Sequence, residues 1–135
     1  MPARVTIPSV IFPSNTETVL PFTSINGGFL NGNFTIQGNG IRVGVNKLCN
    51  VTCQVAFEQN GAGVLNTGNV FVYKNENRIS ETPYSYNIND LSYISVNLYE
   101  PCVAGDVFTV AVKFATASSQ IYIPPNALSV FLIVV

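Results

Sequence analysis

Residues 104–114 read AGDVFTVAVKF, a turn signal followed at once by a strand. Gly105-Asp106 forms the signal, because glycine and aspartate are residue types that turns favour. From Phe108 to Phe114 every second residue is apolar, and Lys113 falls between two of them. Strict alternation of this kind is typical of a β-strand that buries one face. The stretch therefore predicts an antiparallel sheet with a core on one side.

The same pattern recurs along the chain, and no segment shows the period of a helix. Alternating or β-branched runs predict strands at Val51–Phe57, Val70–Tyr73, Arg78-Ile79, Tyr93–Tyr99 and Leu128–Val135. Turn signals separate them, at Asn26-Gly27-Gly28, Asn31-Gly32-Asn33, Gly38-Asn39-Gly40, Asn60-Gly61, Thr67-Gly68-Asn69 and Asn75-Glu76-Asn77. Many short strands with evenly spaced turns indicate a β-sandwich or barrel. The length of 135 residues fits one such domain.

Charged residues make up only 10% of the chain, whereas soluble domains typically carry about 25%. A membrane-spanning helix does not explain the shortfall, because no apolar run approaches the roughly 20 residues that it needs. Burial against other subunits does explain it, since an obligate interface hides apolar surface that a monomer would expose. An unusually apolar monomer is the alternative. The six Lys and Arg residues form no cluster, which argues against nucleic-acid binding.

The last strand is apolar on both of its faces from Val130 onward. A strand of this kind needs its own core on one side and a second cover on the other. A second copy of the chain is the most economical cover, and tyrosine is enriched in such interfaces. We therefore predict interface residues in this strand and in the strand around residue 96: Tyr93, Tyr99, Phe131, Ile133 and Val135. The alternative cover is a loop, such as the Pro-rich N-terminal segment.

The sequence offers no set of catalytic or metal-binding residues. It has no histidine, which excludes the Ser-His-Asp and Cys-His constellations and removes the commonest zinc ligand. Its seven carboxylates are scattered, and Cys49 and Cys53 lack a second ligand pair at zinc-like spacing. We expect a protein that is not an enzyme and that uses no cofactor and no metal.

Three cysteines cannot all pair within one chain. Cys49 and Cys53 lie four residues apart in a predicted strand, about 13 Å at 3.3 Å per residue, which is too far for a disulfide. We expect three reduced cysteines, at least two of them in the core. A bridge from Cys102 to one of the other two is the alternative.

Five segments, in order, resemble the motifs of the superfamily of tumour necrosis factor and the complement globular heads. They are Val19-Leu20-Pro21-Phe22 with Asn26 and Phe29; Phe34-Thr35-Ile36; the hairpin from Val70 to Ile79; Val96-Asn97-Leu98 with Gly105 to Val110; and Leu128 to Ile133. The fourth resembles the family's L-x-L-x-x-G-D-x-V-x-V stretch. Two departures are the strand Asn50–Phe57, which lacks the family's Gly and Tyr, and Val130, which replaces a Gly. The chain resembles divergent microbial or viral members most.

The resemblance implies an all-β, antiparallel jelly-roll sandwich that forms a homotrimer. It divides the chain into an N-terminal extension or first strand over residues 1–15 and a TNF-like jelly-roll domain over residues 16–135. In the trimer an inner sheet, with the Tyr93–Tyr99 strand and the terminal strand, would face the three-fold axis.

The function expected from this resemblance is a non-enzymatic structural or adhesive surface protein. It would be a trimeric knob on a virion, as capsid decoration or fibre head, or on a spore coat. Expected partners are other shell or surface proteins and a host receptor or glycan, with no nucleic acid and no membrane insertion. The expected location is the virion surface; a spore outer layer or secretion is the alternative. The alternative functions are a soluble trimeric receptor-binding ligand and a carbohydrate-binding jelly roll.

Overall fold

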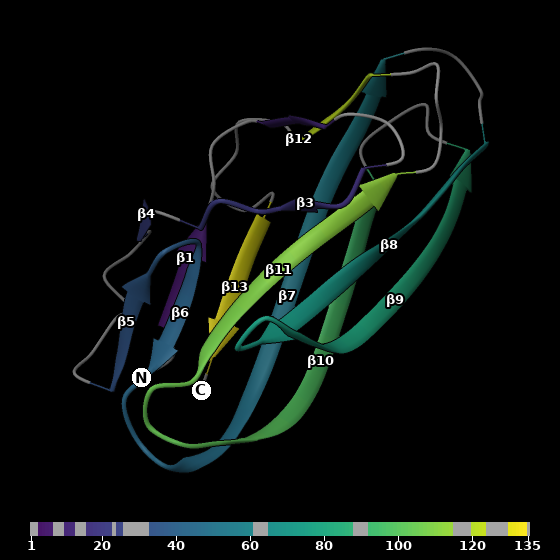
Figure 1. Ribbon diagram of the computed structural model, residues 1–135. Coiled ribbons are helices and arrows are strands. Elements are labelled where there is room, and N and C mark those ends of the chain that lie inside the picture. Colours follow the sequence, from purple (N-terminus) through teal and green to yellow (C-terminus); the bar gives the residue numbers. More distant parts are fainter. Residues whose placement is uncertain are drawn as a thin grey trace.

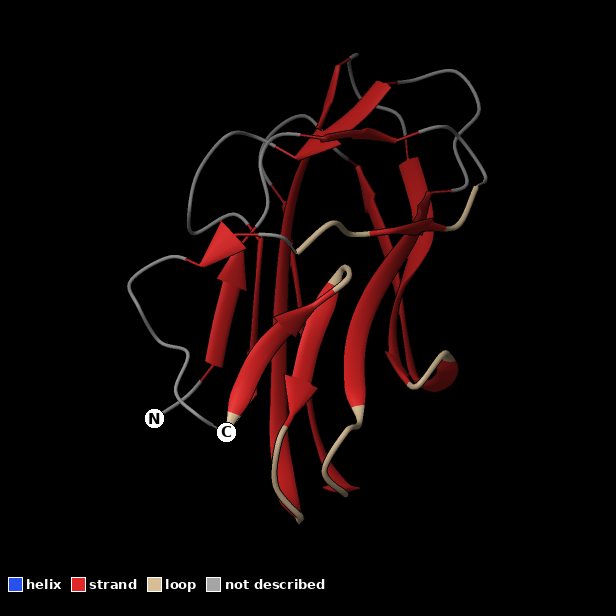
Figure 2. Cartoon of the chain, turned by 60° about the vertical axis from the view of Figure 1, so that its left-hand side comes forward, coloured by secondary structure: helices blue, strands red, loops and turns tan. Residues whose placement is uncertain are grey.

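The computed structural model describes residues 3–6, 10–12, 16–22, 24–25, 33–60, 65–87, 92–114, 120–123 and 130–134. Across these ranges the chain consists of strands joined by turns, with no helix (Figure 2). All strand pairs are antiparallel. The predicted all-β antiparallel class is therefore confirmed.

The strands form two sheets (Figure 1). The first sheet is centred on the long strand β7 and contains β7 (Lys47–Asn60), β10 (Ser92–Cys102), β13 (Val130–Val134), β1 (Ala3–Thr6), β4 (Ser24–Ile25), β12 (Gln120–Ile123) and β2 (Val10–Phe12). The second is centred on β11 and contains β11 (Val107–Phe114), β8 (Leu65–Lys74), β9 (Asn77–Asn87), β6 (Gly40–Val43), β5 (Phe34–Gln37) and β3 (Thr18–Val19).

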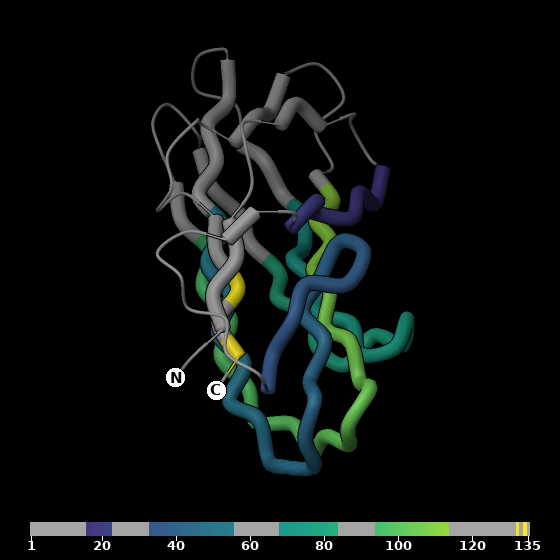
Figure 3. Tube along the Cα trace, turned by 90° about the vertical axis from the view of Figure 1, so that its left-hand side faces the viewer, coloured from purple at the N-terminus to yellow at the C-terminus, as the bar shows by residue number. Residues whose placement is uncertain are grey.

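Two connections cross between the sheets at one end of the sandwich. β6 of the second sheet leads into β7 of the first, and β10 of the first leads into β11 of the second. Figure 3 views the two layers edge-on and shows both crossings at the bottom. At these two crossings, consecutive strands lie in opposite sheets, as in a jelly roll.

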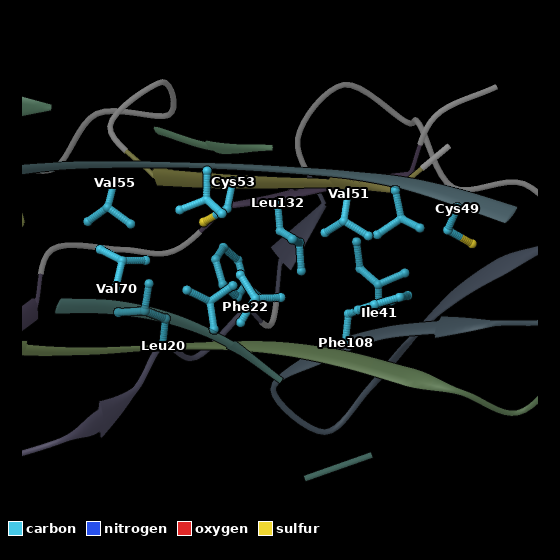
Figure 4. Packing of buried hydrophobic residues seen from close by; sticks show 14 of the residues in the cluster. Leu20, Phe22, Ile41, Cys49, Val51, Cys53, Val55, Val70, Phe108 and Leu132 are labelled. Carbon is cyan, nitrogen blue, oxygen red and sulfur yellow. The ribbon is translucent and has the colours of Figure 1, made fainter. Parts of the chain in front are cut away.

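The core fills the space between the layers. Alternate residues of β7 point inward and are fully buried: Cys49, Val51, Cys53 and Val55. They face residues of the second sheet, such as Phe108, and Leu20 and Phe22 from the segment after β3 (Figure 4). Fully burying each such Val, Leu or Phe side chain contributes about 1.5–3 kcal/mol. The apolar residues of the predicted alternation in β7 therefore fill the core, and the residues between them face outward.

All three cysteines are free and buried, which confirms the expectation of reduced cysteines in the core. Burial raises the pKa of the Cys53 thiol to about 12, because the core does not solvate a thiolate. Burial, with a contact to Cys49, also raises the pKa of Cys102 to about 12. The alternative of a Cys102 bridge is not observed.

A clasp of hydrogen bonds joins the turns at the end where the chain crosses between sheets. The side-chain Nδ2 of Asn75 donates to Asp106 Oδ1 at 2.7 Å. The side-chain Oδ1 of Asn75 accepts from the backbone N–H of Val107 at 2.9 Å. The Val103 amide donates to Asp106 Oδ2 at 2.9 Å. These donors hold the pKa of Asp106 below its usual value. The clasp thus connects the β8–β9 turn to the β10–β11 turn.

The ion pair Lys74–Glu100 links β8 of the second sheet to β10 of the first near the same end, with Nζ and Oε1 2.6 Å apart. The hydrogen bond that Lys74 donates to the Glu100 carboxylate raises the pKa of Lys74. The end of the sandwich at the two crossings is therefore tied across the layers by side chains as well as by the chain itself.

Candidate functional site

The predicted interface strands flank β7 in the first sheet. β10 pairs with one edge of β7 and β13 with the other. Tyr99 lies across from Asn50 and Tyr93 across from Ala56. On the other edge, Phe131 lies across from Gln54 and Ile133 across from Thr52. The structure thus brings four of the five predicted residues into one sheet; the fifth, Val135, lies outside the described residues.

The outward face of the β7–β10 pair carries exposed apolar side chains at the end where the chain crosses between the sheets. Tyr99 is 66% exposed, Leu48 is 61% exposed and Val103 is 59% exposed. Leu48 lies across from Pro101, which is also exposed, and is therefore a diagonal neighbour of Tyr99. We call Leu48, Tyr99, Pro101 and Val103 the apolar patch. It gathers three of the four large hydrophobic residues that are most exposed in the described part of the chain.

Of this patch, the sequence predicts Tyr99 as an interface residue but not Leu48 or Val103. A usable signal for Leu48 was present, because odd-numbered residues of its strand fill the core and the even-numbered ones must face outward. Val103 gave a weaker signal, since it lies just beyond the end of β10.

Polar side chains of β7 form a stripe next to the apolar patch. Asn50, Thr52 and Gln54 are half-buried on the outward face. The Thr52 hydroxyl donates to Asn97 Oδ1 of β10 at 3.2 Å. The side-chain oxygen Oδ1 of Asn50 is buried and has no hydrogen-bond partner among the described residues. An unsatisfied buried acceptor costs about 1–3 kcal/mol, so a donor from a neighbouring molecule would be stabilising there.

Near the apolar patch, the outward positions of this face carry no charged side chain. They are residues 48, 50, 52 and 54 of β7 and residues 95, 97, 99, 101 and 103 in and after β10. Residues that lie close to a rotation axis meet their own copies in a symmetric assembly, so like charges there would repel at short range. A neutral face avoids this repulsion.

The described part of the N-terminal segment leaves this face open. β1 pairs edge to edge with β13, from Ala3 across from Val134 to Thr6 across from Phe131. It extends the sheet and does not lie over it (Figure 1). β1 therefore does not cover the outward face, as the alternative interpretation of the N-terminal segment required.

The described residues contain no group of three or more Cys, Asp or Glu side chains that could hold a metal ion. Within the same ranges no helix is long and apolar enough to cross a membrane.

Comparison of the sequence with protein-family models and with curated proteins finds no match. Solved structures match over nearly the whole chain. The structure of Eiger TNF from S. frugiperda has a TM-score of 0.67 at 9% identity, covering 99% of this chain and 90% of that chain. A crystal structure of murine APRIL has a TM-score of 0.61 at 15% identity, covering 98% and 95% respectively.

At these identities the similarity shows the fold alone. The chain is a TNF-like jelly roll, as the sequence motifs had predicted.

Proposed function

We propose that the chain is a non-enzymatic binding module that assembles as a homotrimer through the outward face of β7, β10 and β13. The observation that carries this proposal is the apolar patch, which is uncharged and lies beside an unsatisfied buried acceptor. Burying apolar surface at about 25 cal/mol per Å² favours association. The resemblance of the sequence to a superfamily of trimeric jelly rolls favours three copies over two.

The setting that we propose for the trimer is a surface knob. A small trimer without catalytic residues suits decoration of a shell or adhesion to another surface, with shell proteins, a host receptor or a glycan as partners. We propose the virion surface as its location, with a spore coat as the alternative.

The absolute molar mass in solution tests the assembly, measured by light scattering under reducing conditions. We expect three times the chain mass of 14.6 kDa. A mass equal to one chain would contradict the proposal, because the apolar patch would then face water in the working protein. A mass of two chains would contradict the three-fold arrangement and leave an interface of a different symmetry.

A second candidate is a soluble trimeric ligand that binds a receptor. The similarity to Eiger TNF and murine APRIL over nearly the whole chain favours it. Immunogold labelling with an antibody against the chain separates the two settings. Label on virions or spores of the source supports the knob, whereas chain found only in the surrounding medium supports the ligand.

A further inference from the structure

The outward face of the second sheet contains two open hollows that adjoin. The larger has a volume of about 560 Å³ and lies between three turns and the start of β11; Gln37, Gly38 and Asn39 line one wall. The smaller has a volume of about 330 Å³ and includes Tyr73. Both are lined by Val19, Glu76 and Thr109. Small-ligand sites typically measure about 300–1,000 Å³, so each hollow has the size of one.

The turn at the junction of the hollows adopts an unfavourable backbone conformation. Asn75 and Glu76 connect β8 to β9 with φ of 51° and 67°. Two consecutive positive φ values are those of a type I′ hairpin turn, in which glycine is preferred at the second position. The other two turns of the larger hollow place glycine at positive φ, at Gly38 and Gly105. The β8–β9 turn alone, of these three, places a long side chain there.

Packing explains Asn75 but not Glu76. The Asn75 side chain makes two hydrogen bonds in the clasp, to Asp106 and to Val107. The Glu76 side chain is exposed and makes no hydrogen bond or ion pair with any residue that the structure describes. Strained positions that the fold does not need are concentrated at binding sites. The strain at Glu76 therefore points to a ligand in the hollows.

The side chains of the larger hollow define the chemistry of that ligand. Gln37 and Asn39 are exposed amides, Glu76 is a carboxylate and Thr109 is a hydroxyl. None of the four has a hydrogen-bond partner among the described residues. Amides donate and accept, whereas a carboxylate only accepts. This set matches adjacent hydroxyl groups, each of which also donates and accepts. The apolar residues Val19 and Val107 line the same hollow.

We propose that the two hollows bind a neutral saccharide, with Glu76, Asn39 and Gln37 bonding to its hydroxyls. An anionic ligand does not fit, because no Lys or Arg lines either hollow. A cationic side chain of a protein fits less well, since a single exposed carboxylate attracts it weakly in water. The other carboxylate, Glu17, is already bonded to Arg78 and Tyr73. The site lies in the sheet opposite the proposed trimer face, so assembly leaves it open.

Binding is tested first with the fluorescently labelled, assembled protein on an array of defined neutral glycans. The methyl glycoside of the terminal sugar that binds best is then titrated into isotope-labelled protein and followed by NMR. We expect shifts at Gln37, Asn39, Glu76 and Thr109. Failure of every neutral glycan to bind, or shifts confined to other surfaces, would overturn the proposal.

Glu76→Gly separates a ligand-binding role from a structural one. The variant relieves the turn, so its Tm should rise by a few degrees, while its affinity for the glycoside should fall at least 10-fold. A higher Tm with unchanged affinity would show that Glu76 has no part in binding and would refute its role.

Glu81→Gln is the matched control, because it removes an exposed carboxylate of β9 that lies outside both hollows. We expect it to keep the affinity of the parent. The mass of the assembly is measured separately, so a monomeric chain that still binds the glycoside would contradict the trimer and leave this site intact.

Discussion

Phe71 and Tyr99 lie on the outward faces of the two sheets, yet Phe71 is 3% exposed and Tyr99 is 66% exposed. The chain covers Phe71 itself: the Arg78 guanidinium carbon lies 3.9 Å from the centre of its ring. Arg78 is held in place by hydrogen bonds of 3.1 Å from Nη2 to Glu17 and to the Tyr73 hydroxyl. Nothing in the described part of the chain covers Tyr99 in this way.

The difference shows that an apolar side chain on the outward face of a sandwich is either covered by its own chain or left exposed. On the second sheet, residues from β8, β9 and the segment before β3 form a polar network that closes over one aromatic ring. Burial and the bond to Glu17 raise the pKa of Tyr73, which keeps it a donor in that network. On the first sheet the apolar patch stays open and uncharged. The first sheet is therefore the one suited to association with another copy.

The largest effect should follow a charge placed in the open patch. Tyr99→Asp would bury an unpaired carboxylate in the assembly, which costs about 3–5 kcal/mol and weakens association at least about 100-fold. We expect the mass to fall to one chain, and Phe131→Asp to act in the same way. The Tm of the parent should rise with protein concentration, and that of Tyr99→Asp should not.

Val19→Asp is the control for this comparison. Val19 is 47% exposed and belongs to β3 of the second sheet, so the same change introduces a charge away from the proposed interface. The variant should keep the parent mass. Equal loss of assembly in both variants would show that the contact surface is not the β7–β10 face.

The next largest effect should come from the clasp that both sheets share. Asp106→Ala removes the acceptor of two hydrogen bonds, from Asn75 and from the Val103 amide. Hydrogen bonds to a charged group contribute about 1.5–3 kcal/mol each, and we expect a loss of about 2–3 kcal/mol in urea unfolding, because the freed donors gain water. Unchanged stability would mean that the clasp is not rigid in solution.

The clasp also predicts a pH dependence. The donors lower the pKa of folded Asp106 below its unfolded value of about 3.9. Folding is therefore stabilised by the carboxylate form; that contribution is complete above the unfolded pKa and is lost as pH falls through the lowered folded pKa. Asp106→Asn should lose less stability than the parent between neutral pH and about pH 3. Equal acid sensitivity would contradict the role assigned to Asp106.

The strands could be predicted from alternation, but the turn predicted at residues 67–69 is wrong. Thr67-Gly68-Asn69 resembles a turn signal, and the structure places all three residues inside β8. Gly68 pairs with Tyr84 and Asn69 with Pro83 of β9, so the ladder overrides the local preference. Pro83 is accepted because β9 is the edge strand of its sheet. The predicted hairpin turn at residues 75–77 is correct in place, although Asn77 already belongs to β9.

The sites were harder to predict than the strands, because they depend on register. The period of β7 marks Leu48 as outward, but only the pairing with β10 places it beside Tyr99. The larger hollow joins Asn39, Glu76 and Gly105, which come from three turns far apart in sequence. They meet because β6 and β8 pair with opposite edges of β11. No local motif carries that information.

The smallest effect should come from uncovering Phe71. Arg78→Ala removes the guanidinium that lies over the ring together with its bonds to Glu17 and Tyr73. The network is exposed to water, so we expect the Tm to fall by only roughly 2–5 °C. Lys47→Ala is the control, because Lys47 lies 5.6 Å from the Phe34 ring and makes no ion pair among the described residues; its Tm should change less. The fall for Arg78→Ala should be the same at low and high protein concentration, since the chain covers this ring without a partner. A fall that grows on dilution would place the Arg78 network in the interface and remove the contrast between the two faces.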